Sequence, residues 1–455
     1  MNRMLIVTTI AVLALGISVA RAELSPPDEL SKQIPELMQH AKVKGLAIAK
    51  VNEGTITWHA AFGARSPDDP MQVDTVFNAA SLTKPVFAMM SLHLVANDTL
   101  TLDGALSDYW IDPDVVNDPR HQALTARIIL SHQSGLPNWR GERQLAFLFA
   151  PGARHEYSGE GYEYLRHAIE NNTQAPLPSL VHKHVFAPAG MTHSAMSWAE
   201  SMGNNVALGF DESGNTIDSA LTEKQPNAAA HLMTTVDDYA RFLSWVAQGA
   251  GLPDPIFQQM QQPQALHDDP AERFGLGWKL IPLTNTELLM HDGREPGVRT
   301  YAVVHPETQE GLVILTNSSN GDLIFRDLIV AALSYGDELM QSTDQLVWDY
   351  LQHLPSQALI PMSQGIAQSP AYLSTLLHAV NTVLVQTSPL TTDEKFAAAQ
   401  AIKPFVLGRL NNTVSAEQAK KLIHQLFVTK QDAVNIATSM DVEQARKWLR
   451  VLENI

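Results

Sequence analysis

The sequence contains no cysteine among its 455 residues. It therefore has no disulfides, no thiol nucleophile, no cysteine-ligated zinc and no iron–sulfur cluster. Positive charge is also scarce, because 31 lysines and arginines stand against 48 aspartates and glutamates. The resulting formal charge of −17 argues against a nucleic-acid partner, since phosphate binding needs clustered lysine and arginine.

Long hydrophobic runs are missing as well, except at the start of the chain. An uncharged apolar run extends from Leu5 to Val19, which is short for a membrane-spanning helix. Ala20-Arg21-Ala22 follows and places small residues where an A-x-A cleavage site needs them. This layout predicts a signal peptide over residues 1–22 and a periplasmic or secreted protein with no stable membrane anchor after cleavage. An uncleaved N-terminal anchor is the alternative.

The chain as a whole is globular in composition, with 45% hydrophobic and 17% charged residues. Two strand-like runs flank Asn52-Glu53-Gly54 and predict a hairpin over residues 45–62. Three more runs between residues 287 and 317 predict an antiparallel meander, and the stretch between the two sets is rich in helices and loops. We predict an α/β fold (an α+β sandwich) whose antiparallel sheet comes from both ends of this region, with helices on its faces and a mostly helical insertion.

The pattern changes after about Gly336, where strand-like runs give way to capped helical patterns. Ser415 and Asp441 each stand as a helix-capping residue with a glutamine three positions later. We therefore predict a main domain over residues 23–338 and a separate all-α domain over residues 339–455. The helical domain is a candidate docking segment for a protein partner.

The tetrapeptide Ser81-Leu82-Thr83-Lys84 is the main candidate for a catalytic motif. If a helix begins at Ser81, the Ser81 and Lys84 side chains share one face. Pro85 fits the first turn of such a helix. A serine there lies beside free backbone N–H groups, and a lysine whose pKa is lowered by burial can remove its proton.

Six further segments turn this short motif into a family pattern. The chain resembles the serine β-lactamase and penicillin-binding protein superfamily, specifically its class C β-lactamase, esterase and D-peptidase branch, over about residues 30–335. The matching segments, in the family's order, are AASLTK from Ala79, LSHQSGLP from Leu130, PGARHEYSGEGYEYL from Pro151, FAPAGMTHS from Phe186, HLMTTVDDYARFL from His231, FGLGW from Phe274 and HDGREPG from His291.

The resemblance implies roles for particular residues. Ser81 matches the acylated nucleophile, Lys84 its partner, and Tyr157 the tyrosine that shuttles a proton. His291-Asp292-Gly293 matches the third motif, with His291 in the catalytic set. The resemblance also implies an oxyanion hole made by the backbone N–H groups of Ser81 and Arg294. Such a mechanism needs no metal and no cofactor.

The chain departs from the family pattern at two positions. The second motif reads Tyr157-Ser158-Gly159, so the asparagine that usually touches the substrate amide is missing. Arg294 stands where a small residue is more usual. We predict substrate contacts from four residues, namely Ser158, Gly159, Gly293 and Arg299. Two nearby residues are predicted to lie outside the chemistry: His132 as packing beneath the site and Glu160 as a loop carboxylate that faces water.

These residues predict an exported serine hydrolase that cleaves a small-molecule or peptide ester or amide through an acyl-enzyme on Ser81. One alternative is a D,D-peptidase or β-lactamase acting on cell-wall peptides or their mimics. Another is a penicillin-recognising sensor without turnover. The retention of Ser81, Lys84 and Tyr157 together favours an enzyme.

Overall fold

The computed structural model describes residues 25–211, 213–217, 225–264 and 273–353. The predicted signal peptide lies outside these residues, and so does the helical segment from residue 354 onward. None of the described helices is long and apolar enough to cross a bilayer.

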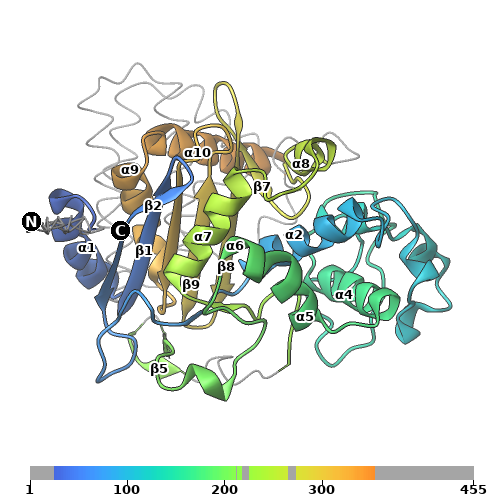
Figure 1. The fold of residues 1–455 in the computed structure, drawn as a ribbon, viewed down its shortest axis with the longest axis horizontal. Coiled ribbons are helices and arrows are strands. Elements are labelled where there is room, and N and C mark those ends of the chain that lie inside the picture. The colour runs from blue at the N-terminus through green and yellow to red at the C-terminus, as the bar shows by residue number, and fades with distance from the viewer. Residues whose placement is uncertain (1–24, 212, 218–224, 265–272, 354–455) are drawn as a thin grey trace, which may run out of the picture.

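A six-stranded antiparallel sheet forms the centre of the described chain (Figure 1). Its strand order is β2-β1-β10-β9-β8-β7, so the first two strands lie beside the last one. Both ends of the domain therefore build one sheet, and the predicted fold class is confirmed. The strands of this sheet are β1 (Gly45–Asn52), β2 (Thr55–Gly63), β7 (Lys279–Pro282), β8 (Glu287–Glu295), β9 (Val298–Val304) and β10 (Gly311–Thr316).

The two faces of the sheet are covered by different helices because side chains alternate along each strand. On β1, Leu46 and Ile48 pack on one face, against α1, α9 and α10, whereas Ala47 and Ala49 pack on the other, against α7. Figure 1 shows α7 running across this second face. The four helices are α1 (Asp28–Ala41), α7 (Val236–Ala247), α9 (Phe325–Ala332) and α10 (Gly336–His353).

The insertion between β2 and β7 is mostly helical, as predicted, and lies beside the sheet (Figure 1). Helix α2 (Thr83–Ala96) is apolar on every side, and 11 of its 14 residues are buried, as expected of a helix inside a core. The other helices of the insertion are α3 (Ala126–Leu130), α4 (Gly159–Thr173), α5 (Leu177–Val181), α6 (Ala187–Ala189) and α8 (Asp254–Met260). Its short strands are β3 (Phe77–Asn78), β4 (Gly209–Phe210), β5 (Thr216–Ile217) and β6 (Met233–Thr234).

Helix α10 closes the sheet face that α1 and α9 also cover. Its Leu339, Met340 and Leu346 are buried in the same apolar cluster as Leu328 of α9. The domain boundary predicted at residues 338 and 339 falls inside this helix. The packing of α10 therefore belongs to the sheet domain, while the predicted all-α domain beyond it stays a prediction.

Candidate active site

Ser81 lies in a tight turn between β3 and α2. Ala80, just before it, has a φ of +48°, a conformation that residues with a Cβ rarely adopt. The Asn78 side chain holds this turn by accepting the Ala80 N–H at 2.7 Å, while Thr83 Oγ1 donates to the Ala80 carbonyl at 2.6 Å. Helix α2 then begins at Thr83. The fixed backbone leaves the Ser81 side chain partly exposed at the start of the helix.

Lys84 is completely buried beneath Ser81. Its Nζ donates to Ser81 Oγ at 3.3 Å and to the Ala229 carbonyl at 2.9 Å. Burial lowers the pKa of Lys84 to about 7, although the carboxylates of Glu295, Asp292 and Glu163 oppose the shift. Close to half of the Lys84 side chains are then neutral amines near pH 7, and a neutral amine can accept a proton.

Tyr157 completes the group around Ser81. Its hydroxyl is hydrogen-bonded to Ser81, and its ring centroid lies 4.5 Å from Lys84 Nζ. Burial raises the pKa of Tyr157 well above its usual value. The tyrosine is therefore a phenol at rest, and Lys84 is the easier of the two groups to deprotonate.

His132 holds Tyr157 in place. Its ring stacks on Tyr157 at 4.2 Å and on Tyr162 at 5.1 Å, and its Nδ1 accepts the Ser158 N–H at 3.1 Å. Burial holds the pKa of His132 far below its usual range, so the imidazole is neutral. The backbone at His132 has a φ of +57°. The predicted packing role agrees with this position.

The third motif lies on β8 beside Ser81. A Cβ added to Gly293 would lie 3.0 Å from the Ser81 backbone nitrogen and 2.7 Å from the Ala79 oxygen, so only glycine allows this approach. In the described chain, β7 pairs only with Glu287–Met290 of β8, which leaves residues 291–295 at an open edge. The strand thus places the peptide groups around Gly293 next to the Ser81 N–H.

Side chains alternate between the two faces along β8, so His291, Gly293 and Glu295 lie on the face toward Ser81. The His291 ring lies 6.1 Å from that of Tyr157, and its Nδ1 donates to the Asp292 carbonyl at 2.7 Å. Burial lowers the pKa of His291 to about 4. His291 is therefore neutral at pH 7, and its Nε2 has no hydrogen-bond partner within the described residues.

The structure does not bring the side chain of Arg299 to Ser81. Thr300, its neighbour on β9, donates to the Ala79 carbonyl, so Arg299 projects from the opposite face. There Arg299 lies 3.5 Å from Asp322, and Arg294 lies 3.3 Å from the same carboxylate. Both guanidinium groups thus lie on the face of the sheet that points away from Ser81.

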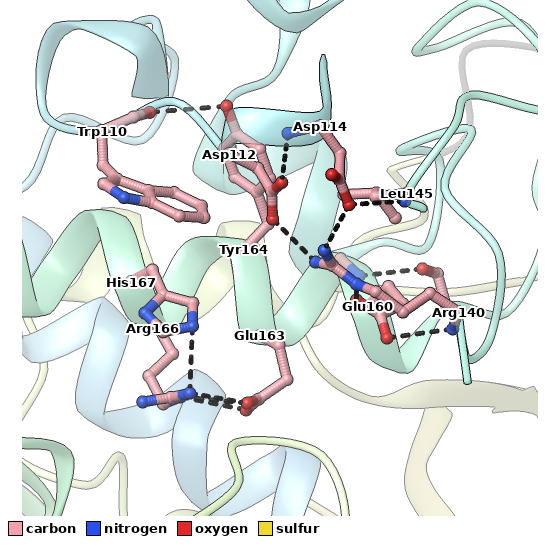
Figure 2. A network of polar contacts seen from close by, with 12 residues as sticks. Trp110, Asp112, Asp114, Arg140, Leu145, Glu160, Glu163, Tyr164, Arg166 and His167 are labelled. Carbon is pink, nitrogen blue, oxygen red and sulfur yellow. Dashed lines mark hydrogen bonds and ion pairs between the residues drawn. The ribbon is translucent and has the colours of Figure 1, made fainter. Parts of the chain in front are cut away.

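The two other predicted contacts in the second motif have structural roles. Ser158 caps α4: its Oγ accepts the Gly161 N–H at 2.9 Å and donates to the Pro137 carbonyl at 2.8 Å. Gly159 is buried under Trp139, since an added Cβ would lie 2.7 Å from the indole ring. The expectation that Glu160 faces water is wrong, because Glu160 is buried and ion-paired with Arg140 at 2.7 Å (Figure 2).

Sequence reasoning missed two residues of this region. Glu295 lies within the HDGREPG segment, but only the register of β8 shows that it faces the site. Trp139 follows the LSHQSGLP segment, and nothing in the motif pattern marked it. An aromatic residue two positions after a matched loop was the available signal.

The sequence model of the Beta-lactamase family matches residues 30–335, well over half of the chain. The chain belongs to the β-lactamase family. The predicted resemblance is therefore confirmed, and the family is one of serine hydrolases that work through an acyl-enzyme.

Individual relatives of this β-lactamase-family protein are distant. The Unguisins hydrolase of Aspergillus violaceofuscus is 24% identical over 347 residues, which cover 64% of this chain and 61% of that protein. The Esterase EstB of Burkholderia gladioli is 28% identical over 199 residues, or 36% of this chain and 50% of that protein. The chain thus spans less than two thirds of the length of either curated relative.

Solved structures share the fold of this β-lactamase-family chain. The penicillin-binding protein from Bacillus halodurans superposes with a TM-score of 0.57 at 21% identity, over 67% of this chain and 100% of that one. The helices and the antiparallel sheet that position Ser81 are thus those of the family fold.

Proposed function

We propose that this protein is an exported serine hydrolase that cleaves small esters, and amides of similar size, through an acyl-enzyme on Ser81. The observation that carries the proposal is the placement of a buried Lys84 Nζ 3.3 Å from Ser81 Oγ with a pKa of about 7. A buried amine poised near neutral pH beside a partly exposed serine is suited to general-base catalysis.

The reaction follows from this placement. Neutral Lys84 takes the proton of Ser81 Oγ as the oxygen attacks the substrate carbonyl carbon. The backbone N–H groups of Ser81 and Arg294 stabilise the oxyanion, where a single donor is worth about 10²–10³ in rate. Tyr157 gives a proton to the leaving group and regains one from the Lys84 ammonium. Water then attacks the ester on Ser81, the same groups move its proton, and the acid is released.

Charge near Ser81 supports neutral or amine-bearing substrates over anionic ones. Glu295 faces the site, and its negative charge raises the pKa of Lys84. His291 is neutral at pH 7, and Arg294 and Arg299 are paired with Asp322 on the far face. A substrate carboxylate, such as that of a β-lactam, therefore gains little electrostatic stabilisation near Ser81. We expect β-lactams to be poor substrates.

Export is part of the proposal and rests on the sequence. The apolar run from Leu5 to Val19 and the following Ala20-Arg21-Ala22 support cleavage before Glu23. Sequencing the N-terminus of the protein recovered from the producing cells tests this part. A chain that retains Met1 in the membrane fraction would contradict it.

Hydrolysis of a matched panel tests the catalytic part. The panel is p-nitrophenyl butyrate, D-alanine p-nitroanilide and nitrocefin, assayed with the unaltered protein, with Ser81→Ala and with Ser91→Ala. Ser91 is buried in α2, where its Oγ donates to the Phe87 carbonyl, so Ser91→Ala is the control. We expect ester turnover that Ser81→Ala abolishes and Ser91→Ala keeps, with nitrocefin the slowest substrate. Equal turnover by Ser81→Ala would overturn the proposal.

A further inference from the structure

Trp139 is a large aromatic side chain that stays 40% exposed although it packs directly on the first residue of α4. A Cβ added to Gly159 would lie 2.7 Å from Cη2 and 2.8 Å from Cζ2 of its indole ring. Gly159 is the first residue of α4 and does not have a positive φ. The glycine is therefore needed here for the close approach of the Trp139 ring and not for an unusual backbone conformation.

This contact lies at the third position of the second motif, two residues after Tyr157. In the family that the sequence resembles, an asparagine at this position touches the substrate amide. Here the indole ring occupies the space into which a side chain at residue 159 would project. An apolar aromatic surface thus stands where the family usually offers a hydrogen-bonding amide.

The segment on the N-terminal side of Trp139 is fixed to α4. The Asn138 side chain accepts the Gly159 N–H at 3.0 Å, and the Asn138 carbonyl accepts the N–H groups of Gly159 and Glu160 at 3.1 and 3.0 Å. These bonds satisfy free donors of the helix N-terminus. They also tie the backbone before Trp139 to the first turn of α4.

The segment on the C-terminal side is fixed by Arg140 (Figure 2). Its backbone N–H donates to Glu160 at 3.0 Å, and its guanidinium contacts Glu160 and Asp112 at 2.7 Å each and Asp114 at 3.2 Å. Asp114 also accepts the Leu145 N–H at 2.8 Å, which holds the following loop. With both neighbours anchored, Trp139 is presented as a rigid aromatic surface, and preorganised aromatic groups are efficient contacts for ligands.

We infer that Trp139 forms the wall of the acyl-group subsite and selects substrates with a flat apolar group, aromatic rings above all, next to the scissile carbonyl. The inference rests on the proposed function, because it concerns the acyl group that Ser81 receives. It also gives a physical reason for the missing asparagine, since that side chain and the indole ring cannot share the space at Gly159.

The test compares esters that share the p-nitrophenol leaving group and differ only in the acyl group. We expect kcat/KM for p-nitrophenyl phenylacetate to exceed that for p-nitrophenyl acetate. Trp139→Ala should lower kcat/KM for the phenylacetate ester roughly 10-fold or more, because the loss of an apolar contact with the substrate typically costs at least this factor. The loss of kcat/KM for the acetate ester should be much smaller. Trp139→Phe should keep most of the preference.

Val330→Ala supplies the control, because Val330 is exposed on α9, on the opposite face of the sheet. It should leave the ratio of the two kcat/KM values unchanged. An equal loss on both esters in Trp139→Ala, or a native preference for acetate, would overturn the inference while Ser81 still forms an acyl-enzyme. Absence of Ser81-dependent turnover on every ester would instead mean that the proposed function itself has failed.

Discussion

Lys84 Nζ lies 3.3 Å from Ser81 Oγ while the Lys84 side chain is fully buried. The burial and the contact act together, because desolvation brings the pKa of Lys84 down to about 7 and the contact directs the amine at Ser81 Oγ. The carboxylates of Glu295, Asp292 and Glu163 keep the pKa from falling further. This balance leads to two predictions on pH and stability.

The rate of acylation should rise with pH through a midpoint of about 7. Neutral Lys84 is the active form, and it becomes populated as the pH rises through its pKa. Tyr157, whose pKa burial raises well above its usual value, stays protonated, so no fall is expected up to pH 9. Burst kinetics with a p-nitrophenyl ester between pH 5 and 9 measure this profile. A rate that is flat or falls across that range would contradict the role of Lys84.

Replacing Lys84 by methionine should stabilise the fold while it slows acylation by orders of magnitude. Between pH 7 and 10.5 the unfolded lysine binds a proton that the folded one does not, so the free energy of unfolding rises with pH in this window. The slope contributed is at most about 1.4 kcal/mol per pH unit. Lys84→Met removes this pH dependence and should raise the free energy of unfolding by ~1–4 kcal/mol at pH 7. Urea unfolding of both proteins at pH 7 and 9 checks the sign, and a variant less stable at pH 7 would refute it.

His132 should matter through its position and not through its charge. Its neutral ring stacks on Tyr157 and accepts the Ser158 N–H from a backbone with φ of +57°. His132→Ala loses the ring and the acceptor, and misplacing Tyr157 by an ångström should lower kcat up to about 100-fold. His132→Asn tolerates the positive φ and offers an acceptor, so it should lose less. The comparison of kcat for the two variants is the test, and equal losses would speak against a positioning role.

The end of the sheet domain should lie after α10. Truncation after Tyr335 removes the buried Leu339, Met340 and Leu346, each worth ~1.5–3 kcal/mol of burial. Truncation after His353 keeps them. We expect the longer chain to keep Ser81 labelling and the shorter one to lose much of its thermal stability. Identical melting temperatures for the two truncated proteins would contradict this boundary.

Much of the sheet could be predicted from the sequence because its strands carry clear signals. Alternating apolar residues and the turn at Gly54 mark β1 and β2, and similar runs mark β8, β9 and β10. Strand β7 gave no such signal, since it has four residues and ends at Pro282. It pairs with β8 across the short turn at residues 283–286, and its short run of residues alone did not mark it as a strand.

The grouping of Ser81, Lys84 and Tyr157 could also be predicted, but the surrounding residues could not be assigned from motifs alone. Arg299 is close to the third motif in sequence, yet the alternation on β9 sends its side chain to Asp322. Glu160 follows the second motif, yet Arg140, 20 residues earlier in the chain, draws it into a buried ion pair. These outcomes depend on strand register and on partners that the sequence does not identify.

Intact-mass spectrometry with a fluorophosphonate probe tests the central claim most directly, because the probe reports which serine is the nucleophile. We predict one adduct per chain, mapped by proteolysis to the peptide that contains Ser81, slowed by orders of magnitude in Lys84→Met and absent from Ser81→Ala. Labelling of the Ser81→Ala protein at the rate of the unaltered one would contradict the account.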